Sequence, residues 1–183
     1  IVKFFPSFLS YVPFLRKSLD PDLAFVNYDY LRELPKFNNV SLNTISDPDF
    51  DFVFVHWMVP HFPFHYDAKT KSLGKTDKGE ESYHENLALA DDLIGRLRRR
   101  MEQTNVWDKS VLILTTDHSL RKANQDPRVP FIVKFPGQSS PVFFEKKFNT
   151  RAVYRFFKSL LTQKQKGPED LIKIIEEEKN VTD

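Results

Sequence analysis

Three short apolar runs constrain the fold of this chain more than any other feature of its sequence. They are Asp51 to Trp57 (DFVFVHW), Val111 to Thr116 (VLILTT) and Val129 to Phe135 (VPFIVKF). In each run, apolar residues occupy both odd and even positions, which is typical of strands that are covered on both faces. The runs therefore predict interior strands of a sheet.

Amphipathic helices are predicted between and after these runs. Ser82 and Glu85 have the spacing of a capping box, and the apolar stripe that follows predicts a helix to about Gln103. A second helix is expected after Asn149-Thr150, and a third at the end of the chain. The stripes of the three helices consist of Tyr83, Leu87, Ala90, Ile94, Leu97 and Met101; Val153, Phe156, Phe157, Leu160 and Leu161; and Leu171, Ile172 and Ile175. This order predicts an α/β fold with a largely parallel sheet flanked by helices.

The first residues resemble the interior of a longer protein. They lack a starting Met, and their apolar sequence is interrupted by Pro6 and Pro13. Within this lead-in, Ala24 to Tyr28 is interpreted as a short strand and Tyr30 to Phe37 as a weak helix that ends at Pro35. We divide the chain into an irregular and helical lead-in, from a missing upstream half, an α/β core portion and a C-terminal amphipathic helix; these segments are 1–47, 48–165 and 166–183.

Composition excludes several classes of function. The chain has five glycines among 183 residues and no GxGxxG or P-loop motif, which argues against nucleotide-binding loops. Its formal net charge is +2 with interspersed signs, so a nucleic-acid partner is not expected. Because it has no cysteine, it has neither a disulfide nor a thiolate metal site. No window reaches the roughly 18 apolar residues of a membrane-spanning helix.

Polar residues that can carry chemistry follow two of the predicted strands. His56, His61 and His65 belong to or follow the first run, and Asp117 and His118 follow the second. An Asp–His pair offers an oxygen and a nitrogen ligand for Zn²⁺ or Mn²⁺, although two ligands do not complete a site. Ligands bind beyond the carboxyl ends of parallel strands, so both loops are expected to border one pocket.

Each of these residues also has a purely structural interpretation. Asp117 could be a turn or N-cap residue, His118 a loop histidine, and His61 a residue packed between Phe62 and Phe64. We expect His56 in the core and both His65 and His84 at the surface. A separate zinc site of His56, His61 and His65 would require convergence that the intervening prolines oppose.

Four segments, in this order and spacing, resemble a known family. They are His56 to Phe64 (HWMVPHFPF), Asp92 to Leu97 (DLIGRL), Leu112 to His118 (LILTTDH) and Val129 to Gly137 (VPFIVKFPG). Together they resemble the carboxyl-terminal half of the sulfatase-like branch of the alkaline phosphatase superfamily, which includes phosphoethanolamine transferases and lipoteichoic acid synthases. The resemblance covers roughly residues 48–165 and implies a partial alkaline-phosphatase-like fold.

The resemblance also implies roles for individual residues. Asp117 and His118 correspond to ligands of a divalent metal, Zn or Mn rather than Ca or Mg, and His61 to a catalytic residue that contacts the transferred phosphate or sulfate. Asp92 and Gly95 match a helix position that packs rather than reacts. Arg121 has no firm counterpart, but a cation one turn past the metal pair could contact an anionic substrate.

The function implied is that of a metal-dependent hydrolase or transferase acting on phosphate or sulfate esters. The membrane-tethered members imply work at the extracytoplasmic face of a membrane, on a lipid headgroup or surface glycan. The family's nucleophile and a further acidic ligand lie upstream, so this chain is expected to be a fragment that acts with the upstream half of the same protein. The alternative is a non-catalytic α/β module that binds a partner, which the absent nucleophile and Ser119, in place of the family's glycine, favour.

Overall fold

A computed structural model describes residues 23–74, 80–119, 128–149, 151–162 and 167–179. The chain divides into two compact units, Ile1–Trp107 and Asp108–Asp183. Within the described residues, no helix has both the length and the apolar character needed to cross a membrane.

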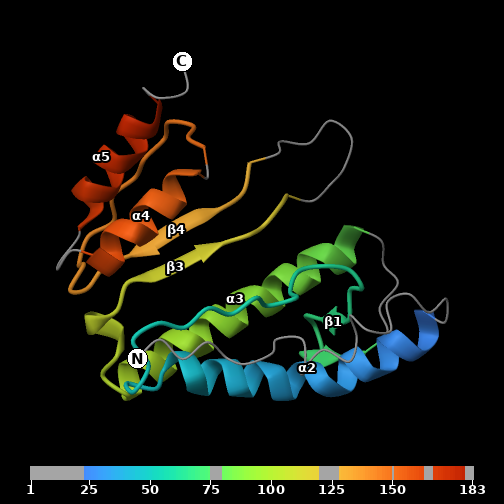
Figure 1. The fold of residues 1–183 in the computed structure, drawn as a ribbon. Coiled ribbons are helices and arrows are strands. Elements are labelled where there is room, and N and C mark those ends of the chain that lie inside the picture. Colours follow the sequence, from blue (N-terminus) through green and yellow to red (C-terminus); the bar gives the residue numbers. More distant parts are fainter. Residues whose placement is uncertain (1–22, 75–79, 120–127, 150, 163–166, 180–183) are drawn as a thin grey trace. The chain divides into compact units, whose positions relative to one another are not determined.

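The first unit is built on two long helices, α2 (Leu23–Ile45) and α3 (Glu80–Gln103), which pack against each other (Figure 1). Short strands β1 (Tyr66–Asp67) and β2 (Ser72–Leu73) form an antiparallel hairpin whose first strand also contacts α3. The core of the first unit is a cluster of buried residues from α2, α3 and the segment between them: Leu34, Val59, Tyr66, Leu89 and Leu93.

Helix α2 differs from the expectation for the lead-in. The predicted strand at Ala24 to Tyr28 is helical, and the helix continues through Pro35 to Ile45. A proline inside a helix costs about 3 kcal/mol because it removes a hydrogen bond and crowds the preceding turn. Here Pro35 lies on the exposed side, whereas the buried stripe continues beyond it at Asn38, Ser41 and Leu42. We attribute the persistence of the helix to that stripe.

The predicted strand at Asp51 to Trp57 is wrong. The described structure assigns no strand to these residues, and the side chain of Phe54 is 78% exposed. An apolar run signals a tendency to be buried, but a strand also requires a neighbour that accepts and donates its backbone hydrogen bonds. No strand pairs with this segment among the described residues.

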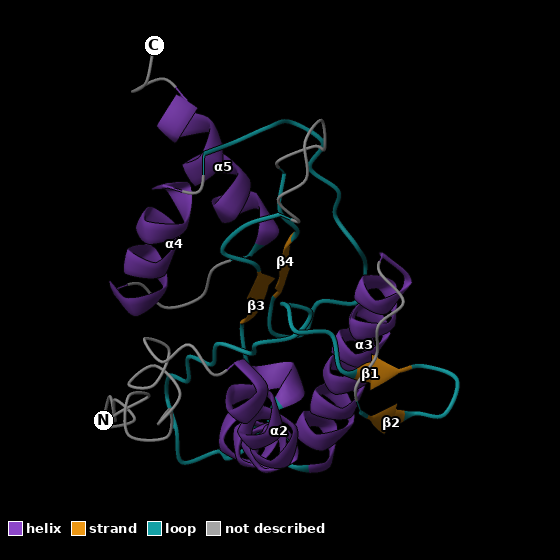
Figure 2. Ribbon diagram, turned by 90° about the vertical axis from the view of Figure 1, so that its right-hand side faces the viewer, coloured by secondary structure: helices purple, strands orange, loops and turns teal. Residues whose placement is uncertain are grey.

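The second unit packs two helices against one face of a hairpin (Figure 2). A short 3₁₀ helix, Trp107–Lys109, spans the boundary between the units. Strands β3 (Leu112–Thr115) and β4 (Phe131–Lys134) pair antiparallel, with Leu112 opposite Lys134. Helices α4 (Arg151–Thr162) and α5 (Pro168–Lys179) follow. The core contains Phe135, Ala152, Phe156, Leu171 and Ile175, with Ile113, Phe131 and Val133 packed against it.

The two later apolar runs do form strands, as predicted, and the chain is a mixed α/β structure. Within the second unit the helices pack against one face of the hairpin, and Ile132 on β4 is 57% exposed, so coverage on both faces stays a prediction. Both ladders in the described residues are antiparallel. The parallel sheet stays a prediction.

The three amphipathic helices are confirmed, with differences at their ends. Helix α3 begins at Glu80, so Ser82 is a buried residue of its first turn rather than the predicted cap. Asn149 does cap α4, because its Oδ1 accepts the N–H of Arg151 at 3.0 Å. Leu161 is 71% exposed and lies outside the buried stripe of α4.

Candidate functional site

Asp117 and His118 follow β3 after one intervening residue, Thr116, in the region where the sequence predicts a polar pair. Oδ1 of Asp117 accepts the backbone N–H of His118 at 3.1 Å. Oδ2 of the same carboxylate lies 3.7 Å from Nε2 of His118. The Asp117 side chain is 68% exposed and that of His118 is 32% exposed, so solvent reaches the carboxylate more freely than the imidazole.

The ring of His118 is held by the backbone. Its Nδ1 lies 2.7 Å from the carbonyl oxygen of Ser119. Since a carbonyl only accepts hydrogen bonds, Nδ1 carries the proton in the neutral ring and Nε2 carries the lone pair. Metal-binding histidines are commonly oriented in this way, with one nitrogen donating to a carbonyl and the other directed at the ion.

These two residues fit a divalent metal as part of a ligand set. A carboxylate oxygen and an imidazole nitrogen 3.7 Å apart can both lie about 2.0–2.2 Å from one ion. Within the described part of the chain, however, no group of three or more His, Cys, Asp or Glu side chains is gathered. Two donors do not complete a metal site by themselves, so the metal role of the pair stays a prediction.

His61 lies in the first unit, in the loop that precedes the β1–β2 hairpin. Its backbone N–H donates to the carbonyl of Met58 at 3.0 Å, and its Nδ1 bonds the carbonyl of Phe62. The side chain is exposed. Phe64 ties this loop to α3, because its ring meets the edge of Tyr83 with the centroids 5.8 Å apart.

The predicted site residues are thus distributed over the two units. His61 belongs to the first unit, whereas Asp117 and His118 belong to the second. Their joint pocket stays a prediction. Arg121 lies outside the described residues.

Two other histidines differ from expectation. His56, predicted in the core, is exposed because its segment is not a covered strand. His65, predicted at the surface, is buried at 5% exposure beside β1, and its carbonyl accepts the N–H of Gly74 at 2.7 Å. Burial lowers the pKa of the His65 imidazole. His84 is exposed, as predicted.

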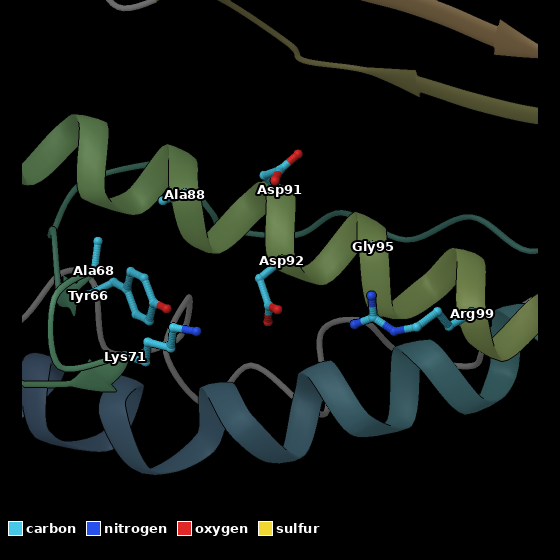
Figure 3. Close-up of a pocket in the computed structure, with 8 residues that line it drawn as sticks. All are labelled: Tyr66, Ala68, Lys71, Ala88, Asp91, Asp92, Gly95 and Arg99. Carbon is cyan, nitrogen blue, oxygen red and sulfur yellow. The ribbon is translucent and has the colours of Figure 1, made fainter.

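A pocket that the sequence does not predict lies in the first unit, between the hairpin and α3 (Figure 3). Its volume is about 320 Å³, and its lining consists of Tyr66, Ala68, Lys71, Ala88, Asp91, Asp92, Gly95 and Arg99. From the sequence, Asp92 and Gly95 are expected only to pack. Their spacing with Arg99 places all three on one helix face, but nothing in the local sequence indicates that a hairpin lies opposite.

A known protein family matches most of this chain. The sequence model described as Sulfatase matches residues 34–164, which include His61, α3 and the Asp117–His118 pair. The chain belongs to the sulfatase family. Its membership confirms the superfamily that the motifs indicated, while the branch within it stays a prediction.

Two curated relatives resemble part of the sulfatase-family chain. Over 93 residues it is 32% identical to human bis(5′-adenosyl)-triphosphatase ENPP4 and 31% identical to the protein of that name from Pongo abelii. The aligned segment is 50% of this chain but 18% and 19% of those relatives. The chain therefore spans about a fifth of the length of the relatives that it matches. No solved structure matches it significantly.

Proposed function

We propose that this chain is the carboxyl-terminal portion of a metal-dependent enzyme that cleaves or transfers phosphate or sulfate esters. The observation that carries the proposal is the family match across the Asp117–His118 pair, whose histidine has the tautomer of a metal ligand. The relatives named as triphosphatases favour phosphate over sulfate and hydrolysis over transfer. The complete enzyme would have an alkaline-phosphatase-like α/β fold, with the predicted parallel sheet.

In this proposal Asp117 and His118 hold the divalent ion. An imidazole ligand favours Zn or Mn over Ca or Mg, which prefer oxygen ligands alone. When bound, such an ion polarises ester oxygens and lowers the pKa of an attacking hydroxyl. Ser119 keeps the imidazole oriented through its carbonyl, so the histidine does not need to reorganise when the ion binds.

His61 is proposed to contact the group that is transferred. An imidazole can donate a hydrogen bond to a non-bridging oxygen, or it can protonate the leaving group as a general acid. The side chain is exposed, which allows a substrate to reach it. Arg121 is proposed to add a positive charge that attracts the anionic ester.

Other parts of the site are proposed to come from the upstream half of the same protein. These are the nucleophile and at least one further acidic ligand. The greater length of the curated relatives supports this division. The transferase branch that the motifs resemble suggests a lipid headgroup or surface glycan as substrate and the extracytoplasmic face of a membrane as location. We propose no nucleic-acid partner.

A second candidate function is a binding module that keeps the fold without catalysis. Ser119 replaces the family's glycine after the Asp–His pair, and the described residues bring together only two metal donors. A module of this kind would bind its partner without turnover.

The test is ester hydrolysis by the full-length protein, stripped of metal and reloaded with Zn²⁺ or Mn²⁺. Substrates are bis(p-nitrophenyl) phosphate, p-nitrophenyl phosphate and p-nitrophenyl sulfate. We expect Asp117→Asn, His118→Ala and His61→Ala each to lower kcat/KM by roughly 10²-fold or more, while the exposed control His84→Ala keeps wild-type activity. Turnover that survives in all three variants would overturn the assignment, and a folded, metal-loaded protein without turnover would favour the binding module.

A further inference from the structure

The pocket between the β1–β2 hairpin and α3 has the size of a small-ligand site. Its volume of about 320 Å³ lies near the lower end of the roughly 300–1,000 Å³ that such sites occupy. All of its lining residues belong to the first unit. One wall comes from the hairpin and the other from α3 (Figure 3).

The hairpin wall is held in place by buried and turn hydrogen bonds. The backbone N–H of Tyr66 donates to Oδ1 of Asn86, a side chain of α3 that is 2% exposed, at 3.1 Å. Oδ1 of Asp67 accepts the N–H groups of Lys69 and Thr70, both at 2.9 Å. The ring of Tyr66 and the stem of Lys71 therefore start from a fixed backbone.

Charged side chains alternate along the pocket. Figure 3 shows the carboxylate of Asp92 between the cationic ends of Lys71 and Arg99. Asp91 also lines the pocket, but its carboxylate is directed away from that of Asp92. Within the described ranges, neither Lys71 nor Arg99 has an ion-pair partner. Among the residues that the structure describes, the ion-pair contact of Asp92 is a long one, 3.9 Å to Nη1 of Arg96. The pocket thus offers positive, negative and positive groups in sequence.

We propose that this pocket binds a small ligand with two acid groups on either side of an ammonium group, the charge pattern of an acidic amino acid. Lys71 and Arg99 each take one acid group, and Asp92 takes the ammonium, which the face of Tyr66 can also attract. The three side chains assigned to the ligand, Lys71, Asp92 and Arg99, sum to one positive charge, and the ligand carries one negative charge. A simple anion would leave Asp92 uncompensated, and a monoacid would leave one cation unpaired.

Gly95 keeps the floor of the pocket open. A Cβ at this position would meet Nη1 of Arg99 at 3.5 Å, an ordinary contact that the free protein tolerates. Alanine also has a higher helix propensity than glycine. Gly95→Ala should therefore raise the melting temperature and still weaken binding, because the methyl group enters the space beside Arg99. Misfolding cannot produce that combination.

Binding of L-glutamate, glutarate and L-glutamine to the full chain, measured by calorimetry, tests the proposal. Glutarate lacks the ammonium and L-glutamine lacks the second acid, so L-glutamate should bind about 10-fold more tightly than either. Lys71→Gln and Arg99→Gln should each weaken L-glutamate binding about 10-fold. Asp92→Asn should abolish the preference for L-glutamate over glutarate. The matched control Lys69→Gln, on the same hairpin outside the lining, should change nothing.

Three results would overturn the proposal: no L-glutamate binding at millimolar concentration, equal binding of the three probes, or an equal loss in Lys69→Gln. The proposal stands independently of ester chemistry. His118→Ala should bind L-glutamate as the wild type does, whether or not that variant loses metal or turnover.

Discussion

Burial of the His65 side chain affects the pKa of its imidazole, and the pH dependence of protein stability tests this effect. Burial lowers the pKa of this imidazole below its ordinary value of 6.5. The His65 imidazole therefore binds a proton more readily in the unfolded chain than in the folded one. The contribution of neutral, buried His65 to the free energy of unfolding is complete above about pH 6.5 and is lost as the pH falls below that value. We expect the urea concentration at the unfolding midpoint to decrease when the pH is lowered from about 7.5 to about 5.5. The decrease should be smaller in His65→Gln. Identical pH dependence in both proteins would contradict this.

For single residues, the sequence predicts position along the chain better than burial. The position of Asp117 and His118 after a strand was predictable, because an apolar run that ends in polar residues is a local signal. The exposure of His56 and the burial of His65 were not, because each depends on what packs against its segment. Asp92 and Gly95 line a pocket because the hairpin lies opposite α3, and this long-range packing is not visible in the local sequence.

Helices are predictable from the sequence where an apolar stripe marks one face of the helix. Helices α3, α4 and α5 each have an apolar stripe and were found. Helix α2 was cut short in the prediction because Pro35 is a strong local breaker, whereas its packing against α3 is not local. The supposed strand at Asp51 to Trp57 failed for the related reason that strand pairing is also non-local.

Helix α4 is expected to depend on one aromatic residue. Phe156 is 0% exposed, and its ring meets that of Phe135 edge-on at 5.9 Å between centroids. Phe156→Ala should lower the free energy of unfolding by about 3–5 kcal/mol. Phe143, which is 84% exposed, gives the matched control, and Phe143→Ala should change it by less than about 0.5 kcal/mol. Urea denaturation measures both, and equal losses in the two variants would refute this account of the core.

At the scale of the whole molecule, the chain divides into two units at a point where the local sequence has no glycine or proline to indicate a linker. The boundary at Trp107 and Asp108 lies in the sequence TNVWDKS, which contains no glycine or proline. This division separates His61 from Asp117 and His118. The predicted segment boundaries near residues 47 and 165 and the shared pocket therefore stay predictions, because both depend on long-range arrangement.

The claim that the Asp117–His118 pair binds a divalent metal is tested most directly by Zn²⁺ titration of the metal-free full-length protein. We predict saturable binding in the wild type, unchanged affinity in the exposed control His84→Ala, and at least 10-fold weaker binding in His118→Ala, about the smallest loss expected when a ligand is removed. Equal Zn²⁺ affinity in His118→Ala and the wild type would contradict the account.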